Sequence, residues 1–329
     1  MDLLWRAISE SRPGPKWAGL FAEYWPAYRR WWAREGLERR PTYRHCQRAL
    51  QEHMPEIVPL WEELCVQAGG SDMAARFLSF WCPPPYLSGC SQAVWPGAQP
   101  VLVRNYDYSP SAFDRVILRT EWQGRKVIGT SDGLFGLVDG MNDAGLVISL
   151  TFGGRRVVGR GFGVPLILRY VLQTCKTAED AADTLARIPT HMSYNVTVLD
   201  KKRTVRTVLM APDRPAQITH AAVATNHQDK PEWEAHARAT ATIERERFLL
   251  QRLTLHVEPE EKFISAFLKP PLYSMAFQFG FGTLYTAIYR PRRGEMELRW
   301  PNSRWPLPLA GFEDESRLVF TPVPLGVIG

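Results

Sequence analysis

Apolar and polar positions follow two different periods along the 329 residues of the chain. In residues 1–89, apolar side chains recur every three or four positions, which indicates amphipathic helices. We predict helices over 17–33, 41–66 and 71–80, with Ser71 as the N-cap of the third. Three consecutive prolines at 83–85 end this part, because proline lacks an amide donor and restrains the residue before it.

From Cys90 onward, short runs with a period of two predominate, which is typical of strands. Strands are predicted at 101–108, 115–122, 126–131, 134–139, 146–152, 192–199, 204–210, 218–225, 283–289 and 295–300. Helices are predicted at 164–174, 177–188, 232–253 and 260–268. Strands, then two helices, then strands again suit an α+β fold of two stacked antiparallel sheets with helices outside.

Composition and charge narrow the class of protein. The chain is 45% hydrophobic and 22% charged, as in ordinary globular proteins. Its net charge of +6 is scattered rather than clustered, which favours a solvated surface over nucleic-acid binding. No apolar run is long enough to span a membrane, and the N-terminus lacks the pattern of a signal peptide. We therefore expect a cytoplasmic protein with neither nucleic-acid nor membrane partners.

The cysteines and histidines argue against two kinds of site. Five cysteines, an odd number without CxxC spacing, do not indicate a disulfide framework. The seven histidines show no metal-ligand spacing, so we expect no metal and no metal-dependent chemistry. A reducing compartment would keep a catalytic thiol in its reduced form.

The junction Gly89-Cys90-Ser91 follows directly on the proline-rich break. If the bond between Gly89 and Cys90 were cleaved, Cys90 would carry a thiol and a free α-amine, so that nucleophile and base occupy one residue. Glycine upstream leaves room for the thiol to reach the preceding carbonyl. The alternative is a buried cysteine that packs as a small hydrophobe.

Arg104 and Asp107 are the predicted partners of Cys90. Arg104 would stabilise the thiolate and Asp107 would hold the α-ammonium group; the alternative is a surface ion pair of little consequence. Residues three apart in a regular strand point to opposite faces. We therefore expect a bulge or turn near residues 105–107, so that both side chains reach Cys90.

These segments together resemble the N-terminal-nucleophile hydrolases. The most similar branch is the acyl-CoA:6-aminopenicillanic acid acyltransferase family, to which choloylglycine hydrolases and penicillin V acylases are related. The resemblance covers most of residues 82–290 and rests on several motifs in the family's order. They are Gly89-Cys90-Ser91, Val103-Arg104-Asn105-Tyr106-Asp107-Tyr108, Asp139-Gly140-Met141-Asn142-Asp143-Ala144-Gly145-Leu146, the apolar segment from Val164 into Thr177-Ala178-Glu179-Asp180, and Ala224-Thr225-Asn226-His227.

The resemblance implies an αββα sandwich made as a precursor. Residues 1–89 would form a helical pro-segment and residues 90–329 the catalytic domain. Asn226 would donate a hydrogen bond to the oxyanion, and a later arginine belongs to the site. Arg245 is the best match for this arginine, and Arg247 is the alternative. From local sequence alone, both would lie on a solvated helix face with alternating charges. Residues expected to border the substrate are Asn142, Thr151, Asn195 and His227.

The expected function is that of a self-processing cysteine amidohydrolase or acyltransferase, which acts on a linear N-acyl amide through a Cys90 thioester. It needs no cofactor, although a coenzyme A thioester stays open as acyl donor. Retention or release of the pro-segment and formation of a homo-oligomer also stay open. The competing hypothesis is an uncleaved, inactive binding or scaffold protein with the same fold.

Overall fold

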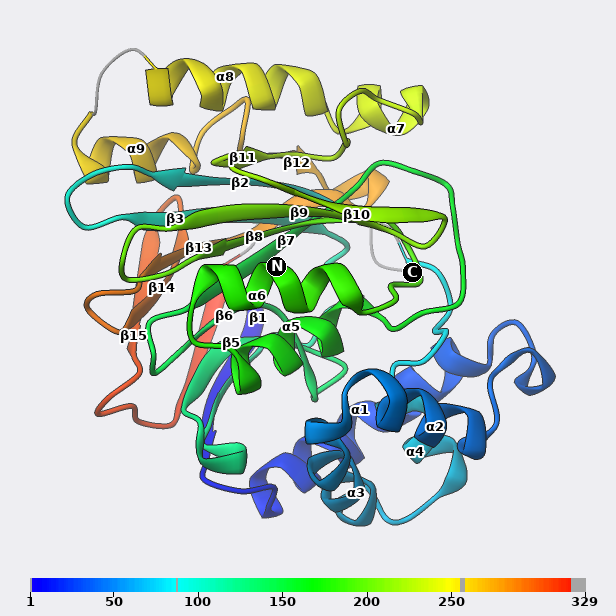
Figure 1. Cartoon of the computed structure of the whole chain (residues 1–329). Helices are drawn as coiled ribbons and strands as arrows, with labels where there is room; N and C mark the ends of the chain where they lie inside the picture. Colours follow the sequence, from blue (N-terminus) through cyan, green and yellow to red (C-terminus); the bar gives the residue numbers. More distant parts are fainter. Residues whose placement is uncertain (1, 87, 255–257, 321–329) are drawn as a thin grey trace.

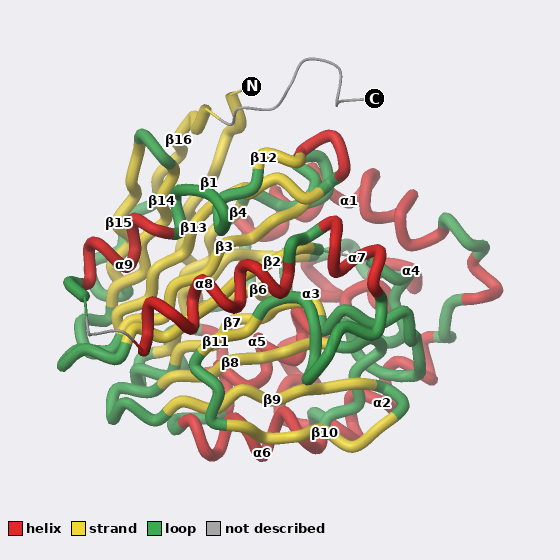
Figure 2. The backbone as a smooth tube through the Cα atoms, turned by 90° about the horizontal axis from the view of Figure 1, so that it is seen from above, coloured by secondary structure: helices red, strands yellow, loops and turns green. Residues whose placement is uncertain are grey.

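Two β-sheets lie face to face and are covered on both outer sides by helices, so the elements form four layers (Figure 1). The computed structural model describes residues 2–86, 88–254 and 258–320. Helices α5 (Val164–Thr174) and α6 (Ala178–Arg187) cover one sheet. Helices α7 (Glu234–Ala239), α8 (Thr242–Thr254) and α9 (Glu260–Ala266) lie on the other (Figure 2). The predicted αββα sandwich is confirmed.

The larger sheet has nine strands in the order β10-β9-β8-β7-β6-β5-β4-β1-β16. Neighbouring strands are antiparallel except for β1 and β4, which are parallel. Their bounds are β1 Asp2–Glu10, β4 Val116–Thr120, β5 Val127–Asp132, β6 Gly136–Asn142, β7 Val147–Phe152, β8 Tyr194–Leu199, β9 Val205–Ala211, β10 Arg214–Thr219 and β16 Glu315–Phe320.

The smaller sheet has the order β11-β2-β3-β13-β14-β15, with β12 paired to β13. Their bounds are β2 Gly89–Trp95, β3 Val101–Tyr108, β11 Val223–Ala224, β12 Met275–Ala276, β13 Phe281–Arg290, β14 Glu295–Trp300 and β15 Ser303–Pro308. The prediction of one strand over 218–225 is wrong. The chain changes sheets there, from β10 in the larger sheet to β11 in the smaller one.

Four helices near the N-terminus pack at one end of the sandwich (Figures 1 and 2). They are α1 Pro15–Ala33, α2 Tyr43–His53, α3 Val58–Gln67 and α4 Asp72–Leu78. The helix predicted over 41–66 is interrupted by a short 3-10 turn over Pro55–Ile57, because Pro55 has no amide to continue the ladder. Ser71 Oγ accepts a hydrogen bond from the amide of Ala74, which confirms the predicted cap. No described helix is both long and apolar enough to cross a membrane.

The prediction that residues 1–89 form only helices is wrong, because they also contain strand β1. It lies between β4 and β16, and its alternate residues Leu3, Trp5 and Ala7 are buried. The ring of Trp5 packs between the sheets against Trp300 and Tyr285, with centroid distances of 5.5 and 5.4 Å. The first 89 residues therefore contribute a strand to the sandwich as well as a helical cluster.

Candidate active site

Cys90 lies at the start of β2, buried and directly opposite Tyr106 of β3. Its Sγ is 3.4 Å from Nη2 of Arg104 and 3.8 Å from Oγ of Ser88. Burial raises the pKa of the Cys90 thiol, and the nearby Arg104 guanidinium opposes that rise. In the unbroken chain the thiol is therefore protonated at neutral pH, beside a cation that would stabilise the thiolate.

Asp139 of β6 holds the Arg104 guanidinium from the facing sheet. Its Oδ2 forms a buried ion pair with Nη1 of Arg104, which also donates to the carbonyl of Val138 at 3.0 Å. The hydroxyls of Tyr285 and Tyr289 donate to the same carboxylate at 2.7 and 2.5 Å. Asp139 was not predicted as a site residue, although it begins the Asp-Gly-Met-Asn segment; its partner lies 35 residues away on another sheet.

Asp107 approaches Cys90 from the opposite side of the strand. The predicted bulge near 105–107 is wrong, because the register of β2 with β3 is unbroken from Gly89–Asp107 to Trp95–Val101. The irregularity lies in β13, between Thr283 and Tyr285. Arg104 and Asp107 therefore point to opposite faces, with Arg104 beside the thiol and Asp107 beside the backbone of Gly89. A Cβ atom at position 89 would lie only 3.2 Å from Cβ of Asp107, which explains why glycine suits it.

Arg245 and Asn226 connect Asp107 to the amide of Cys90. Nη1 of Arg245 donates to Asp107 at 2.9 Å, and its Nη2 donates to Oδ1 of Asn226 at 2.7 Å. The same oxygen accepts the backbone N–H of Cys90 at 2.9 Å. Burial raises the pKa of Asp107, while the charge of Arg245 opposes the rise. Of the two arginines left open by the sequence, Arg245 is buried here and Arg247 is exposed.

The orientation of Asn226 differs from the predicted oxyanion role. Its oxygen faces two donors, so its amide nitrogen points the other way and donates to the carbonyl of Phe152 at 3.2 Å. In the unbroken chain this side chain holds the backbone nitrogen of Cys90, which is the leaving group in a cleavage after Gly89. The sequence resemblance indicated the residue but not which end of its amide meets Cys90.

Thr151, Asn195 and His227 lie behind Asn226 and not against the thiol. Nδ2 of Asn195 donates to Thr151 Oγ1 at 3.1 Å and to the carbonyls of Thr225 and His227, each at 2.9 Å. Nδ1 of His227 lies 3.0 Å from Thr242 Oγ1 at the start of α8. These three residues anchor the segment that carries Asn226, and their predicted contact with the substrate stays a prediction.

Replacing Asn195 with leucine, which has a similar size and no amide, should test this anchoring. We expect cleavage after Gly89 to slow about 10-fold, because two buried carbonyls lose their donor and Asn226 shifts. For the same reason, the free energy of unfolding should fall by about 1–3 kcal/mol. Cleavage is followed by denaturing electrophoresis well below the melting temperature. Asn302→Leu, at an exposed position, is the control. An unchanged rate in Asn195→Leu would contradict the anchoring role.

Asn142 lies away from Cys90. Its Nδ2 donates to the carbonyls of Leu172 and Cys175 at the end of α5, each at 2.9 Å, and its Oδ1 accepts two backbone amides of the following turn. Asn142 and Asp139 are three residues apart in one strand, so they face opposite sides of the sheet. Asn142 therefore holds the end of α5 and the following turn, and its predicted contact with the substrate stays a prediction.

The described residues contain no group of three or more His, Cys, Asp or Glu side chains that could hold a metal ion. The arrangement around Cys90 consists of a thiol, two arginines, two carboxylates and an amide. It combines a nucleophile, a cation beside it, and hydrogen-bond partners on the adjoining peptide nitrogen. Such a set is equipped for acyl transfer to sulfur.

Comparisons with known proteins give one family match and several solved structures of low similarity. The family model described as acyl-coenzyme A:6-aminopenicillanic acid acyl-transferase matches residues 95–305. No curated protein sequence matches the chain. Among solved structures, an N-acylethanolamine-hydrolyzing acid amidase ortholog from Caenorhabditis elegans is 17% identical, with a TM-score of 0.48, over 67% of this chain and 100% of that one.

Two further solved structures are similar. A mutant of conjugated bile acid hydrolase from Clostridium perfringens is 14% identical, with a TM-score of 0.44, over 71% of this chain and 98% of that one. Penicillin V acylase from Agrobacterium tumefaciens is 16% identical, with a TM-score of 0.44, over 68% and 87% of the two chains.

Proposed function

Since this chain belongs to the acyl-coenzyme A:6-aminopenicillanic acid acyl-transferase family, a family of N-terminal-nucleophile enzymes that hydrolyse amides or transfer acyl groups, we propose that it is a self-processing cysteine enzyme. It would act on linear N-acyl amides through a thioester at Cys90. One observation carries the proposal: at a Gly-Cys junction, the thiol lies 3.4 Å from a guanidinium while the Cys90 amide is bound by Asn226. The alternative, an inactive scaffold, would not require these contacts.

Self-processing would begin with attack of Cys90 Sγ on the carbonyl carbon of Gly89. The C–S bond forms as the C–N bond breaks, and the thiol proton passes to the departing nitrogen. Water then hydrolyses the thioester, which leaves a carboxylate on Gly89 and a free α-amine on Cys90. Asp107 and Asn226 would bind the resulting ammonium group, since both lie on the side of the strand where that nitrogen sits.

In turnover, the α-amine would take the proton of the thiol. Their ordinary pKa values, about 7.7–8.0 and about 8.5, make this exchange nearly balanced. The thiolate attacks the substrate amide, the amine product leaves, and a thioester remains. Water then gives hydrolysis and an amine acceptor gives transfer; exclusion of water from the site decides between them. A coenzyme A thioester, named in the family's description, is a second candidate acyl donor. Because the nucleophile is a thiol, we place the enzyme in the reducing cytoplasm.

We further infer that residues 1–89 stay bound after cleavage. Strand β1 pairs on both sides within the larger sheet. Trp17 Nε1 donates to the carbonyl of Leu134 at 2.7 Å, and the Tyr24 hydroxyl donates to that of Asp114 at 2.8 Å. Removal of the segment would expose the apolar core beneath it.

Purified protein should elute from a native sizing column as one species and separate under denaturing conditions into two. Mass spectrometry should find fragments of 89 and 240 residues, from 329 − 89 = 240. A single full-length chain of 37.5 kDa in mature protein would support the scaffold instead. Elution of the 240-residue fragment alone would refute retention of the segment but leave cleavage intact.

A further inference from the structure

A cavity of about 600 Å³ lies between helices α1 and α4 on one side and the ends of strands β3 and β5 on the other. Its volume is typical of sites for small organic molecules. The cavity is bordered by α1, α4, residues 83–86, the end of β3, the loop 111–115 and the turn after β5. Its walls are mainly aromatic: Tyr24, Tyr28, Trp31, Phe77, Phe80, Tyr86, Tyr108 and Phe113.

Two carboxylates line this aromatic cavity, and they differ in their partners. Asp114 accepts hydrogen bonds from the hydroxyls of Tyr28 and Ser131 and from the amide of Leu134. Asp132 forms no ion pair with a described residue; its half-buried carboxylate interacts with the backbone amide of Gly133. The Tyr86 hydroxyl is buried and faces the hydroxyl of Tyr194, but it has no hydrogen bond of normal geometry among the described residues. A carboxyl without an ion-pair partner and a buried phenol without a hydrogen bond of normal geometry are costly in an apolar cavity unless a ligand completes them.

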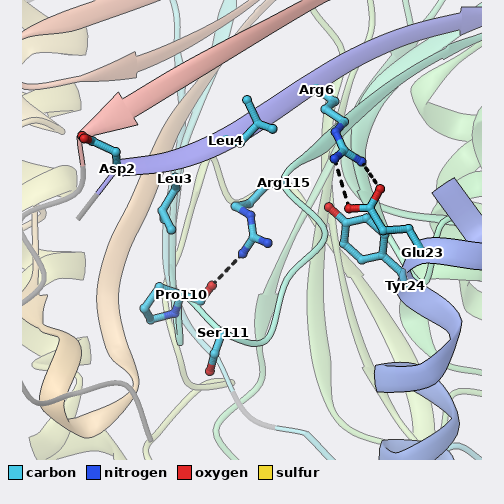
Figure 3. Close-up of a pocket in the computed structure, with 9 residues that line it drawn as sticks. All are labelled: Asp2, Leu3, Leu4, Arg6, Glu23, Tyr24, Pro110, Ser111 and Arg115. Carbon is cyan, nitrogen blue, oxygen red and sulfur yellow. Dashed lines mark hydrogen bonds and ion pairs between the residues drawn. The ribbon is translucent and has the colours of Figure 1, made fainter.

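The two arginines of the cavity are engaged elsewhere. Arg34 donates to the carbonyl of Pro85 at 2.6 Å. Arg115 donates to the carbonyl of Pro110 at 3.1 Å, and its guanidinium lies in an adjoining smaller pocket beneath β1 (Figure 3). Neither guanidinium is paired with Asp132, so this carboxylate can still receive a cation.

The residues that line this cavity lie close to Cys90 along the chain and across the sheet. Tyr86 precedes Cys90 by four residues, and Ser88 Oγ lies 3.8 Å from Sγ. Tyr106 pairs with Cys90 across the two strands. Tyr108, which lines the cavity, lies two residues further along β3, and the centroids of the two rings are 5.7 Å apart. A molecule in the cavity therefore lies beside the strand that carries the nucleophile.

We propose that this cavity binds the end of the substrate that carries an organic ammonium group on an apolar body. The aromatic faces attract the cation, Asp132 forms an ion pair with it, and the remaining walls cover the apolar part. The inference rests on the proposed function only in assigning the ligand to the substrate. It narrows the substrate class to amides with a basic nitrogen besides the amide.

Burial raises the pKa of Asp132 to about 8, and the neighbouring Asp114 adds to this rise. Groups facing Asp132 from the surrounding elements are Asp114, Arg104, Tyr28, Tyr86, Tyr106, Tyr108 and Tyr194. With this raised pKa the Asp132 carboxyl is mainly protonated at neutral pH, and binding of a cation would displace the proton. Since only the ionised carboxylate pairs with a cation, affinity should rise with pH up to about 8 and then level off.

Calorimetry with three probes of similar size tests the proposal: phenethylammonium, 2-phenylethanol and 3-phenylpropionate. The protein is the Cys90→Ala variant, which keeps the chain intact and does not turn over, so binding is separated from catalysis. We expect phenethylammonium to bind at least 10-fold more tightly than the other two, and more tightly at pH 8 than at pH 6. Asp132→Asn in the same background should abolish this preference, whereas Asp143→Asn, at the exposed acid paired with Arg125, should not.

Equal binding of the cation and the alcohol, or tighter binding of the anion, would overturn the proposal. So would an unchanged preference in Asp132→Asn, with folding checked by circular dichroism. Failure of the proposed function would appear differently, as an intact Gly89–Cys90 bond in the wild-type protein while the cation still binds.

Discussion

The Cys90→Ala variant should remain a single chain of 37.5 kDa and should not turn over N-acyl amides at a measurable rate. Alanine has no nucleophile, so neither the shift of the Gly89 acyl group to sulfur nor formation of a substrate thioester can occur. We expect both rates to fall at least about 10³-fold, the size of effect seen when a covalent nucleophile is removed. Time courses by mass spectrometry and an amide-release assay measure the two rates.

Controls make the Cys90 result specific. Cys65→Ala, on α3 in the N-terminal helical cluster, should cleave and turn over normally. Because burial raises the pKa of the Cys90 thiol, the thiolate fraction of the precursor grows as pH rises toward that value. Cleavage of the wild-type precursor should therefore accelerate with increasing pH. Persistent cleavage in Cys90→Ala would refute the mechanism outright.

Replacing Arg104 with leucine should reduce both stability and activity. The change removes the cation 3.4 Å from Cys90 Sγ and leaves the buried carboxylate of Asp139 without its ion-pair partner. Breaking a buried pair in this way costs about 3–5 kcal/mol in the free energy of unfolding. Loss of the charge beside the sulfur should slow cleavage and turnover by about 10²–10³-fold. Denaturant unfolding and the two rate assays provide the measurements.

The double variant Arg104→Leu with Asp139→Asn separates these two effects. Without the orphaned charge, much of the lost stability should return, while the rates should stay low because the sulfur still lacks its cation. Recovery of wild-type rates in the double variant would show that Arg104 acts only through folding. The single variant Asp139→Asn should have an intermediate rate, because Arg104 keeps its bond to the Val138 carbonyl but loses its charged partner.

Much of the scaffold could be predicted from local patterns. Period-two runs predicted β3 and β7 nearly to the residue, and caps at Ser71 and Thr177 predicted the starts of α4 and α6. Strands β1, β2, β12, β15 and β16 were not among the predicted strands. Short strands carry few residues of pattern, and their pairing depends on neighbours far along the chain.

The residues near Cys90 were predicted better than their arrangement. Cys90, Arg104, Asp107, Asn226 and Arg245 are brought together in the structure. The alternation of side chains in β3 correctly implied opposite faces for Arg104 and Asp107, but the bulge invoked to avoid this does not exist. Arg104 lies on the thiol side of the strand and Asp107 beside the backbone of Gly89, so both reach Cys90 without a bulge.

By itself, the sequence determined the types of chemical group and the face of each element on which they lie, because alternation and helical periodicity are properties of neighbouring residues. Only the tertiary structure decided which groups meet. It brings Asn226 to the Cys90 amide from 136 positions along the chain, pairs Arg104 with Asp139 across the two sheets, and inserts β1 between β4 and β16. Such contacts depend on how distant segments close and pack, which local periodicity does not encode.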